Sequence, residues 1–258
     1  MIDLVAREAP LPLVGGGGLI ALVLACELGA AARRRGPAAP GEHGVADDGN
    51  ILAAVLGLLG LLLAFTFNLA LDRHETRRAL VVAEANDLGT AYLRTALLDD
   101  PAALRQDLRA YAQARLSYGL AAAGPAQDAA AARADALQAT VWRDATAALA
   151  SLRTTPVSGL VLAPINEAFD TASKRKSALA ARLPTAVVGT LALYSLIAAG
   201  MLGYTAAGAG RRSRVTSTLL FMLLTLAICL ILDLDRARSG MIQVPQTPMA
   251  DVIAAMRP

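Results

Sequence analysis

Charged residues are scarce in this sequence, and their scarcity separates it from soluble proteins. Only 17% of its 258 residues are Asp, Glu, Lys or Arg, while 55% are hydrophobic. The mean hydropathy is +0.49. A soluble domain carries about a quarter charged residues, so this chain has too few to cover a surface that faces water. The composition therefore predicts an integral membrane protein.

Histidine and cysteine are also rare, with two of each. His43 stands in a Gly-rich segment and His74 beside the end of an apolar run, and neither has a second ligand at the spacing of a metal site. Cys26 and Cys229 lie inside apolar runs, which excludes a disulfide framework of the secreted type. The sequence has no nucleophile elbow and no Gly-rich phosphate loop followed by Lys. We therefore expect no enzyme activity, no metal site and no cofactor.

The positive charge is not arranged for binding nucleic acid. The formal net charge is only +3, and the arginines lie in short clusters beside apolar runs. That distribution is typical of the flanks of membrane helices rather than of a phosphate-binding stripe. We expect the chain to contact membrane lipid and not nucleic acid.

Four stretches are apolar for long enough to cross a bilayer core, which takes about twenty helical residues. Acidic residues precede the first stretch and no cleavage site follows it, so we expect a retained helix rather than a signal peptide. Its Gly15–Gly18 run is expected to allow close helix packing or a bend rather than to bind phosphate. Because helices satisfy their own backbone groups in lipid, we predict membrane helices near residues 11–32, 51–71, 184–207 and 215–232.

Between the second and third stretches lie about a hundred residues with helical spacing of apolar side chains. Pro and Gly break this segment into several helices. Residues 36–50, which join the first and second apolar stretches, also contain Pro and Gly and are predicted as a loop. The prediction is an all-α integral membrane fold with an inserted helical domain between two pairs of membrane helices. Its parts are a first transmembrane pair (1–71), a water-facing domain (72–183) with helices near 72–98, 101–122, 126–154 and 164–183, a second transmembrane pair (184–234) and a C-terminal tail (235–258).

The stretch LLLAFTFNLALDRHETRR, from Leu61 to Arg78, is predicted as a long helix that leaves the membrane. Gly57, Leu61 and Phe65 are spaced four residues apart and share one face, which would form an apolar ring if several subunits surrounded an axis. The polar residues that follow would form a collar at the water boundary, with ion pairing along the helix: Asn68, Asp72, Arg73, Glu75 and Arg78. The simpler alternative is a lipid-facing helix whose charged residues mark its exit from the membrane.

The spacing in this stretch resembles a known family. Phe65 is followed by Asn68 three residues later, by Asp72 and Arg73 seven and eight residues later, and by Arg78 thirteen residues later. This pattern is similar to the end of the second membrane helix in bestrophins, a family of chloride channels. The chain as a whole resembles the bestrophin-like family of bacterial membrane proteins of unknown function. That wider resemblance includes EANDLGTAYLR from Glu84 and LDLDRARSGMIQV from Leu232.

The resemblance implies a multi-pass protein of a bacterial inner membrane that assembles with copies of itself, as a ring of five, and passes small anions. It also implies that Gly57, Leu61 and Phe65 line a pore neck. The sequence departs from the bestrophin pattern in four ways. His74-Glu75 replaces a Trp pair, and the Glu that follows that pair in bestrophins stands one position early here. Gly57 replaces a larger neck residue, and the acidic calcium clasp of eukaryotic bestrophins is absent.

Two questions stay open at this level. Arginines flank the membrane helices on both sides, so the positive-inside rule does not decide which side the inserted domain faces. Two functions also fit: a homo-oligomeric anion channel with a hydrophobic neck lined by the second helix, and a non-conducting membrane sensor or scaffold whose inserted domain binds a protein partner.

Overall fold

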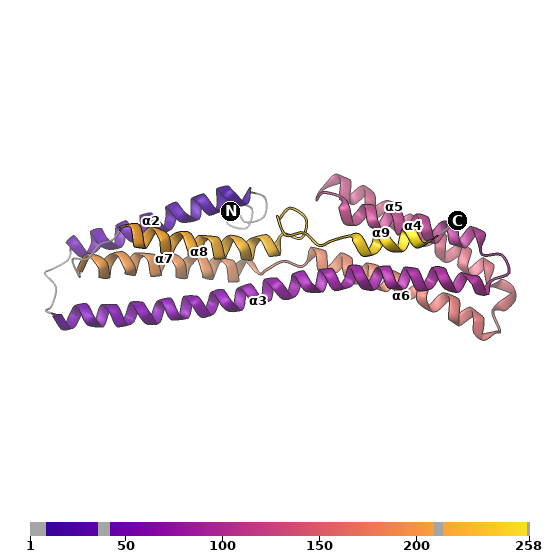
Figure 1. The fold of residues 1–258 in the computed structure, drawn as a ribbon, viewed down its shortest axis with the longest axis horizontal. Coiled ribbons are helices and arrows are strands. Elements are labelled where there is room, and N and C mark those ends of the chain that lie inside the picture. Colours follow the sequence, from indigo (N-terminus) through magenta and orange to yellow (C-terminus); the bar gives the residue numbers. More distant parts are fainter. Residues whose placement is uncertain (1–8, 36–41, 209–213, 257–258) are drawn as a thin grey trace. The chain divides into compact units, whose positions relative to one another are not determined.

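A computed structural model describes residues 9–35, 42–208 and 214–256, and within these ranges the chain is predominantly helical and contains no strand. The helices separate into two compact units (Figure 1). Unit 1 comprises Met1–Asp72 and Arg182–Arg236, and unit 2 comprises Arg73–Ala181 and Ala237–Pro258. Helix α3 (Glu42–Arg94) begins in unit 1 and ends in unit 2.

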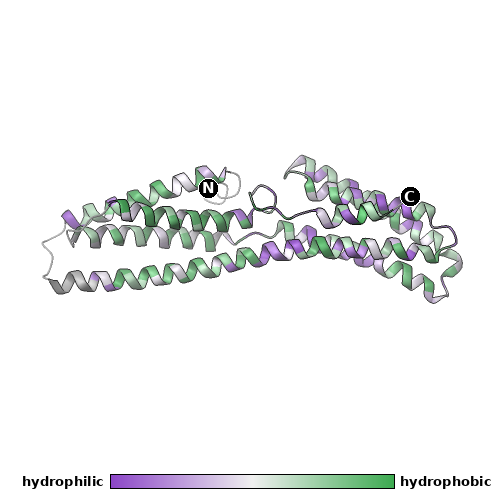
Figure 2. Cartoon of the chain, viewed as in Figure 1, coloured by the Kyte–Doolittle hydropathy of each residue, from purple (hydrophilic) through white to green (hydrophobic). Residues whose placement is uncertain are grey.

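Unit 1 contains α2 (Leu11–Arg35), α7 (Thr185–Gly208), α8 (Arg214–Asp235) and the first part of α3. Helix α2 runs beside α7 and α8, and these helices are apolar along most of their length (Figures 1 and 2). Four helices of the described chain are long and apolar enough to cross a membrane. The predicted all-α membrane fold is confirmed.

Glycines set the distance between α2 and α7. A Cβ atom on Gly29 would lie 1.9 Å from the carbonyl oxygen of Gly200, and one on Gly203 would lie 1.9 Å from that of Cys26. The two backbones can approach this closely only because neither position carries a side chain. Of the Gly15–Gly18 run, only Gly15 lies against another helix, because a Cβ atom added there would lie 3.0 Å from the sulfur of Cys229, whereas one added at Gly16, Gly17 or Gly18 would meet no atom within 4 Å.

The prediction of a loop through residues 36–50 was wrong from Glu42 onward, because α3 begins there. Residues 36–41 lie outside the described ranges. A long-range contact supports the additional turns: Arg33 of α2 forms an ion pair with Asp48, 3.4 Å between nitrogen and oxygen. The same guanidinium donates a hydrogen bond to the Tyr204 hydroxyl at 2.9 Å. Sequence periodicity contains no information about such a partner.

Unit 2 is a helical bundle with one hydrophobic core. It contains the end of α3, the short 3₁₀ helices η1 (Thr95–Leu97) and η2 (Ala150–Leu152), and the helices α4 (Ala102–Leu120), α5 (Pro125–Ala148), α6 (Pro156–Ala180) and α9 (Thr247–Ala255). Leu88, Leu108, Val141 and Ile165 are fully buried at its centre. Met249 of α9 is also fully buried there, so the C-terminal segment packs within this unit.

The prediction that Pro164 starts a helix was also wrong, because Pro164 lies inside α6, which begins at Pro156. A proline within a helix has no N–H to donate to the carbonyl four residues earlier, here that of Leu160. Arg94 supplies the missing donor, with 2.9 Å between its Nη1 and the Leu160 oxygen. The helix therefore continues because a side chain from α3 replaces the lost hydrogen bond.

Candidate functional site

The three predicted pore-neck residues lie on one exposed face of α3. Leu61 is 52% exposed and Phe65 is 64% exposed. Gly57 is exposed too, with open space where a Cβ atom would stand. The opposite face of the helix is buried, with Leu59 and Ala70 in the apolar core of unit 1. The structure therefore places the predicted residues together, on a surface that unit 1 does not itself cover.

The predicted collar residues fall into two groups. Asn68 and Asp72 are exposed and continue the line of Leu61 and Phe65, at steps of three and four residues. Glu75 and Arg78 form an ion pair at 3.5 Å, with both side chains more than half exposed. Such a pair contributes little stability in water.

Arg73, the remaining collar residue, is half-buried in unit 2. Its Nε is buried and has no hydrogen-bond partner among the described residues. A collar at this level would therefore combine exposed polar groups with one arginine that the chain partly encloses.

Unit 2 contains a buried charge cluster that the sequence did not predict. The Glu84 carboxylate is fully buried between two arginines, with Arg115 on one oxygen and Arg175 on the other, the latter at 2.6 Å. Arg175 also donates to the side-chain oxygen of Gln246. The Arg115 guanidinium lies 4.9 Å from the centre of the Tyr118 ring, a cation–π distance.

Two further arginines of unit 2 hold helix ends. Arg77, 1% exposed, donates to the carbonyl oxygens of Ala178 and Ala181 at 3.1 and 2.7 Å, where α6 ends. Arg238 donates at 2.7 and 2.8 Å to the carbonyls of Tyr118 and Ala121, where α4 ends. Guanidinium groups at these positions satisfy carbonyls that a helix leaves without partners and interact favourably with its dipole.

A cavity of about 180 Å³ lies among these groups, and we call it the arginine pocket. Its walls come from α3, the ends of α4 and α6, and the C-terminal segment that precedes α9. The polar side chains that line it are three arginines and two glutamines: Arg77, Arg175, Arg238, Gln243 and Gln246.

The surroundings of the pocket lower the pKa of the Arg238 guanidinium. Burial lowers the pKa of its guanidinium below the usual value, and the positive charges of Arg175 and Arg115 lower it further. The Nη2 atom of Arg238 is buried and has no hydrogen-bond partner among the described residues.

Two sequence signals could have located these groups. Arg77 and Glu84 share one helical face with the buried residues Val81 and Leu88, at positions where an apolar ridge would be expected. Glu84 and Arg238 also lie in the two longer stretches that carry the family resemblance.

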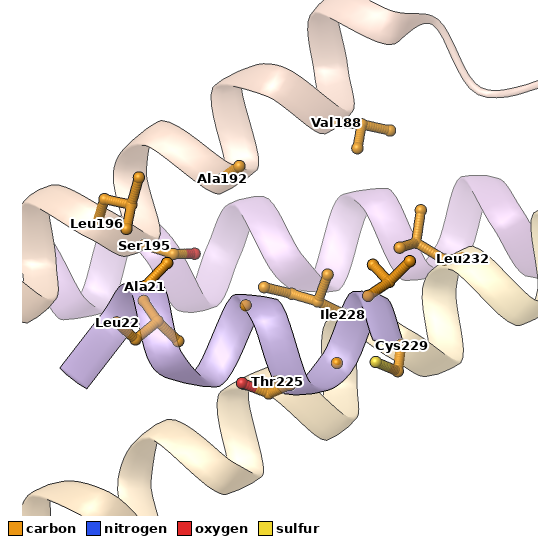
Figure 3. Close-up of a pocket in the computed structure, with 13 residues that line it drawn as sticks. Ala21, Leu22, Val188, Ala192, Ser195, Leu196, Thr225, Ile228, Cys229 and Leu232 are labelled. Atoms are coloured by element: carbon orange, nitrogen blue, oxygen red, sulfur yellow. The ribbon is translucent and has the colours of Figure 1, made fainter. Parts of the chain in front are cut away.

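Unit 1 has a cavity of a different kind, about 310 Å³ in volume, between α2, α7 and α8 (Figure 3). Its lining is apolar apart from Ser195, Thr225 and Cys229. The Ser195 hydroxyl donates to the Leu191 carbonyl at 2.7 Å, while the buried Thr225 hydroxyl has no partner among the described residues. A lining with neither charged nor aromatic side chains suits lipid tails and has no group that would prefer an ion of one sign.

Comparisons with known proteins agree with this architecture. A family model described as the Bestrophin-like domain matches residues 19–249. The chain matches no curated protein. A crystal structure of a membrane protein has a TM-score of 0.65 at 13% identity, over 92% of this chain and 95% of that one, a likeness that shows the fold alone. Since the family model spans most of the sequence, the chain belongs to the bestrophin-like family.

Proposed function

We propose that this protein is a homo-oligomeric channel for small anions in a bacterial inner membrane, with a hydrophobic neck formed by Gly57, Leu61 and Phe65 of α3. Family membership supports a channel-type protein. The observation that carries the proposal is the uncovered stripe on α3, because these three residues and the polar positions beyond them share one exposed face.

The position of Asn68 supports a water-filled pore, and not lipid, beside the exposed face of α3. Asn68 is exposed, lies three residues beyond Phe65, and has Leu69 and Leu71 after it, so it stands inside the apolar stretch. A polar side chain turned toward lipid loses its hydrogen bonds with water, which is costly. The same side chain facing a water-filled axis loses nothing.

A neck of this composition would gate by controlling water. A narrow apolar ring holds water poorly, and it can close to ions by dewetting without closing sterically. Phenyl rings have electropositive edges, so inward-facing edges at Phe65 would tolerate an anion better than a cation. Gly57, with open space beside it, would leave the neck wider one turn beyond Leu61.

Two measurements on the purified full-length protein test the proposal. Native mass measurement in detergent should give a ring, of five subunits by resemblance to bestrophins. Reconstituted liposomes should release chloride faster than empty liposomes, and faster than they release potassium under a matched gradient. A monomer at every concentration, or chloride release equal to that of empty liposomes, would refute the channel and favour the non-conducting scaffold.

A further inference from the structure

Positive charge gathers at the arginine pocket of unit 2, which Arg77, Arg175 and Arg238 line. Arg175 shares the Glu84 carboxylate with Arg115. Arg238 has no carboxylate partner among the described residues, and burial, together with the charges of Arg175 and Arg115, lowers its pKa. The end of α4, whose carbonyls accept from Arg238, contributes only about half a negative charge beside it.

The pocket is built rather than incidental. A Cβ atom on Gly119 would lie 2.5 Å from Nη2 of Arg175 and 2.3 Å from the side-chain oxygen of Gln246. Glycine at this position therefore lets both side chains approach the α4 backbone. Nη2 of Arg238 is buried and has no hydrogen-bond partner among the described residues, so an anion that drew this guanidinium into the pocket would satisfy a donor whose burial is otherwise costly.

We propose that the arginine pocket binds a compact oxyanion, either a phosphate group or a small carboxylate, with Arg238 as its principal ligand. Guanidinium groups match the paired oxygens of phosphate and carboxylate better than they match a halide. A volume of about 180 Å³ has room for roughly six water molecules. That is enough for phosphate and too little for a nucleotide, and the site is separate from the neck on α3.

Such a ligand would fix the C-terminal segment to unit 2. Arg238, Gln243 and Gln246 all come from the segment between α8 and α9, while Arg77 and Arg175 come from α3 and α6. An anion held among them would join these three parts of the chain. Phosphate should therefore slow proteolysis of residues 237–246 in the wild-type protein.

Calorimetric titration of the full-length protein in detergent with inorganic phosphate, at constant ionic strength in chloride, tests the site. We expect saturable binding of one phosphate per chain. Arg238→Gln should weaken it at least about tenfold, the effect of losing one hydrogen bond between charged groups. Arg143→Gln is the matched control, because that arginine of α5 is exposed and pairs with Asp144, and phosphate binding by this variant should stay within about twofold of wild type.

A second variant keeps the test valid if Arg238→Gln fails to fold. Gln243 is largely exposed yet lines the pocket, so Gln243→Glu places a carboxylate there without disturbing the core. It should raise the melting temperature in the absence of phosphate and weaken phosphate binding at least about tenfold, because the built-in anion competes. A lowered melting temperature with unchanged phosphate binding would overturn the proposal, as would the absence of saturable binding to the wild-type protein.

A parallel titration with a short-chain phosphatidic acid identifies the source of the phosphate group. Tighter binding of the lipid than of inorganic phosphate would assign the pocket to a lipid headgroup, and the reverse order would assign it to a free anion. Either order supports an oxyanion site.

Discussion

Replacing Gly203 by alanine tests how closely α2 and α7 pack. The new Cβ atom would lie 1.9 Å from the Cys26 carbonyl oxygen, whereas ordinary contacts begin at 3.4 Å. The helices would have to separate locally by about 1.5 Å, since a backbone carbonyl inside a helix cannot turn away. Overpacking of this kind typically costs about 1–3 kcal/mol, and the upper part of that range applies when backbone must move.

Alanine also has a higher helix propensity than glycine, by about 1 kcal/mol. The net loss for Gly203→Ala should therefore be about 1–2 kcal/mol. Gly189→Ala is the matched control on the same helix, because no atom lies within 4 Å of its new Cβ. That variant should be neutral or slightly stabilised.

Thermal unfolding of the full-length variants in detergent measures both effects. Each kcal/mol of lost stability lowers the melting temperature of a chain of this size by about 2–4 °C. Gly203→Ala should therefore melt several degrees below the wild-type protein, and Gly189→Ala should melt at or above it. If both variants melt with the wild-type protein, α2 and α7 do not approach each other as described.

Two further substitutions test unit 2, both measured by the free energy of unfolding. Glu84→Gln leaves two buried arginines without their carboxylate and should cost about 3–5 kcal/mol. Its control, Glu75→Gln, breaks an exposed pair and should cost less than about 1 kcal/mol. Equal losses would show that Glu84 is not buried between its arginines. Arg94→Ala should destabilise the protein by about 1 kcal/mol, because the Leu160 carbonyl loses its donor. The loss should be smaller in a Pro164→Ala background, where the backbone N–H returns. An equal loss in both backgrounds would mean that Arg94 does not compensate for the proline.

The membrane helices could be predicted from sequence because their signal is local. Long apolar runs place α2, α7 and α8 within a few residues of their observed ends. Two errors lie where a distant side chain contacts the backbone or side chain in question. Asp48 gains Arg33 as a partner and α3 starts early, while Arg94 satisfies the Leu160 carbonyl and α6 passes through Pro164.

The candidate sites also differ in whether one helix or several helices build them. The spacing of Gly57, Leu61 and Phe65 predicted a shared face because one helix carries all three. The arginine pocket could not be predicted, because α3, α4, α6 and the C-terminal segment each supply part of its wall. Periodicity identifies which residues of one helix lie together, but not which helices meet.

Chloride efflux from liposomes, normalised to reconstituted protein, tests the neck most directly. Phe65→Ala should widen the ring, ease its wetting and raise basal efflux above that of the wild-type protein. Leu61→Ala should act in the same direction. Leu62→Ala is the control, because Leu62 packs against the apolar core of unit 1, and it should change efflux little. Efflux equal to that of empty liposomes for the wild-type protein and all three variants would contradict the channel, and a selective response at Leu62 would show that another face of α3 lines the pore.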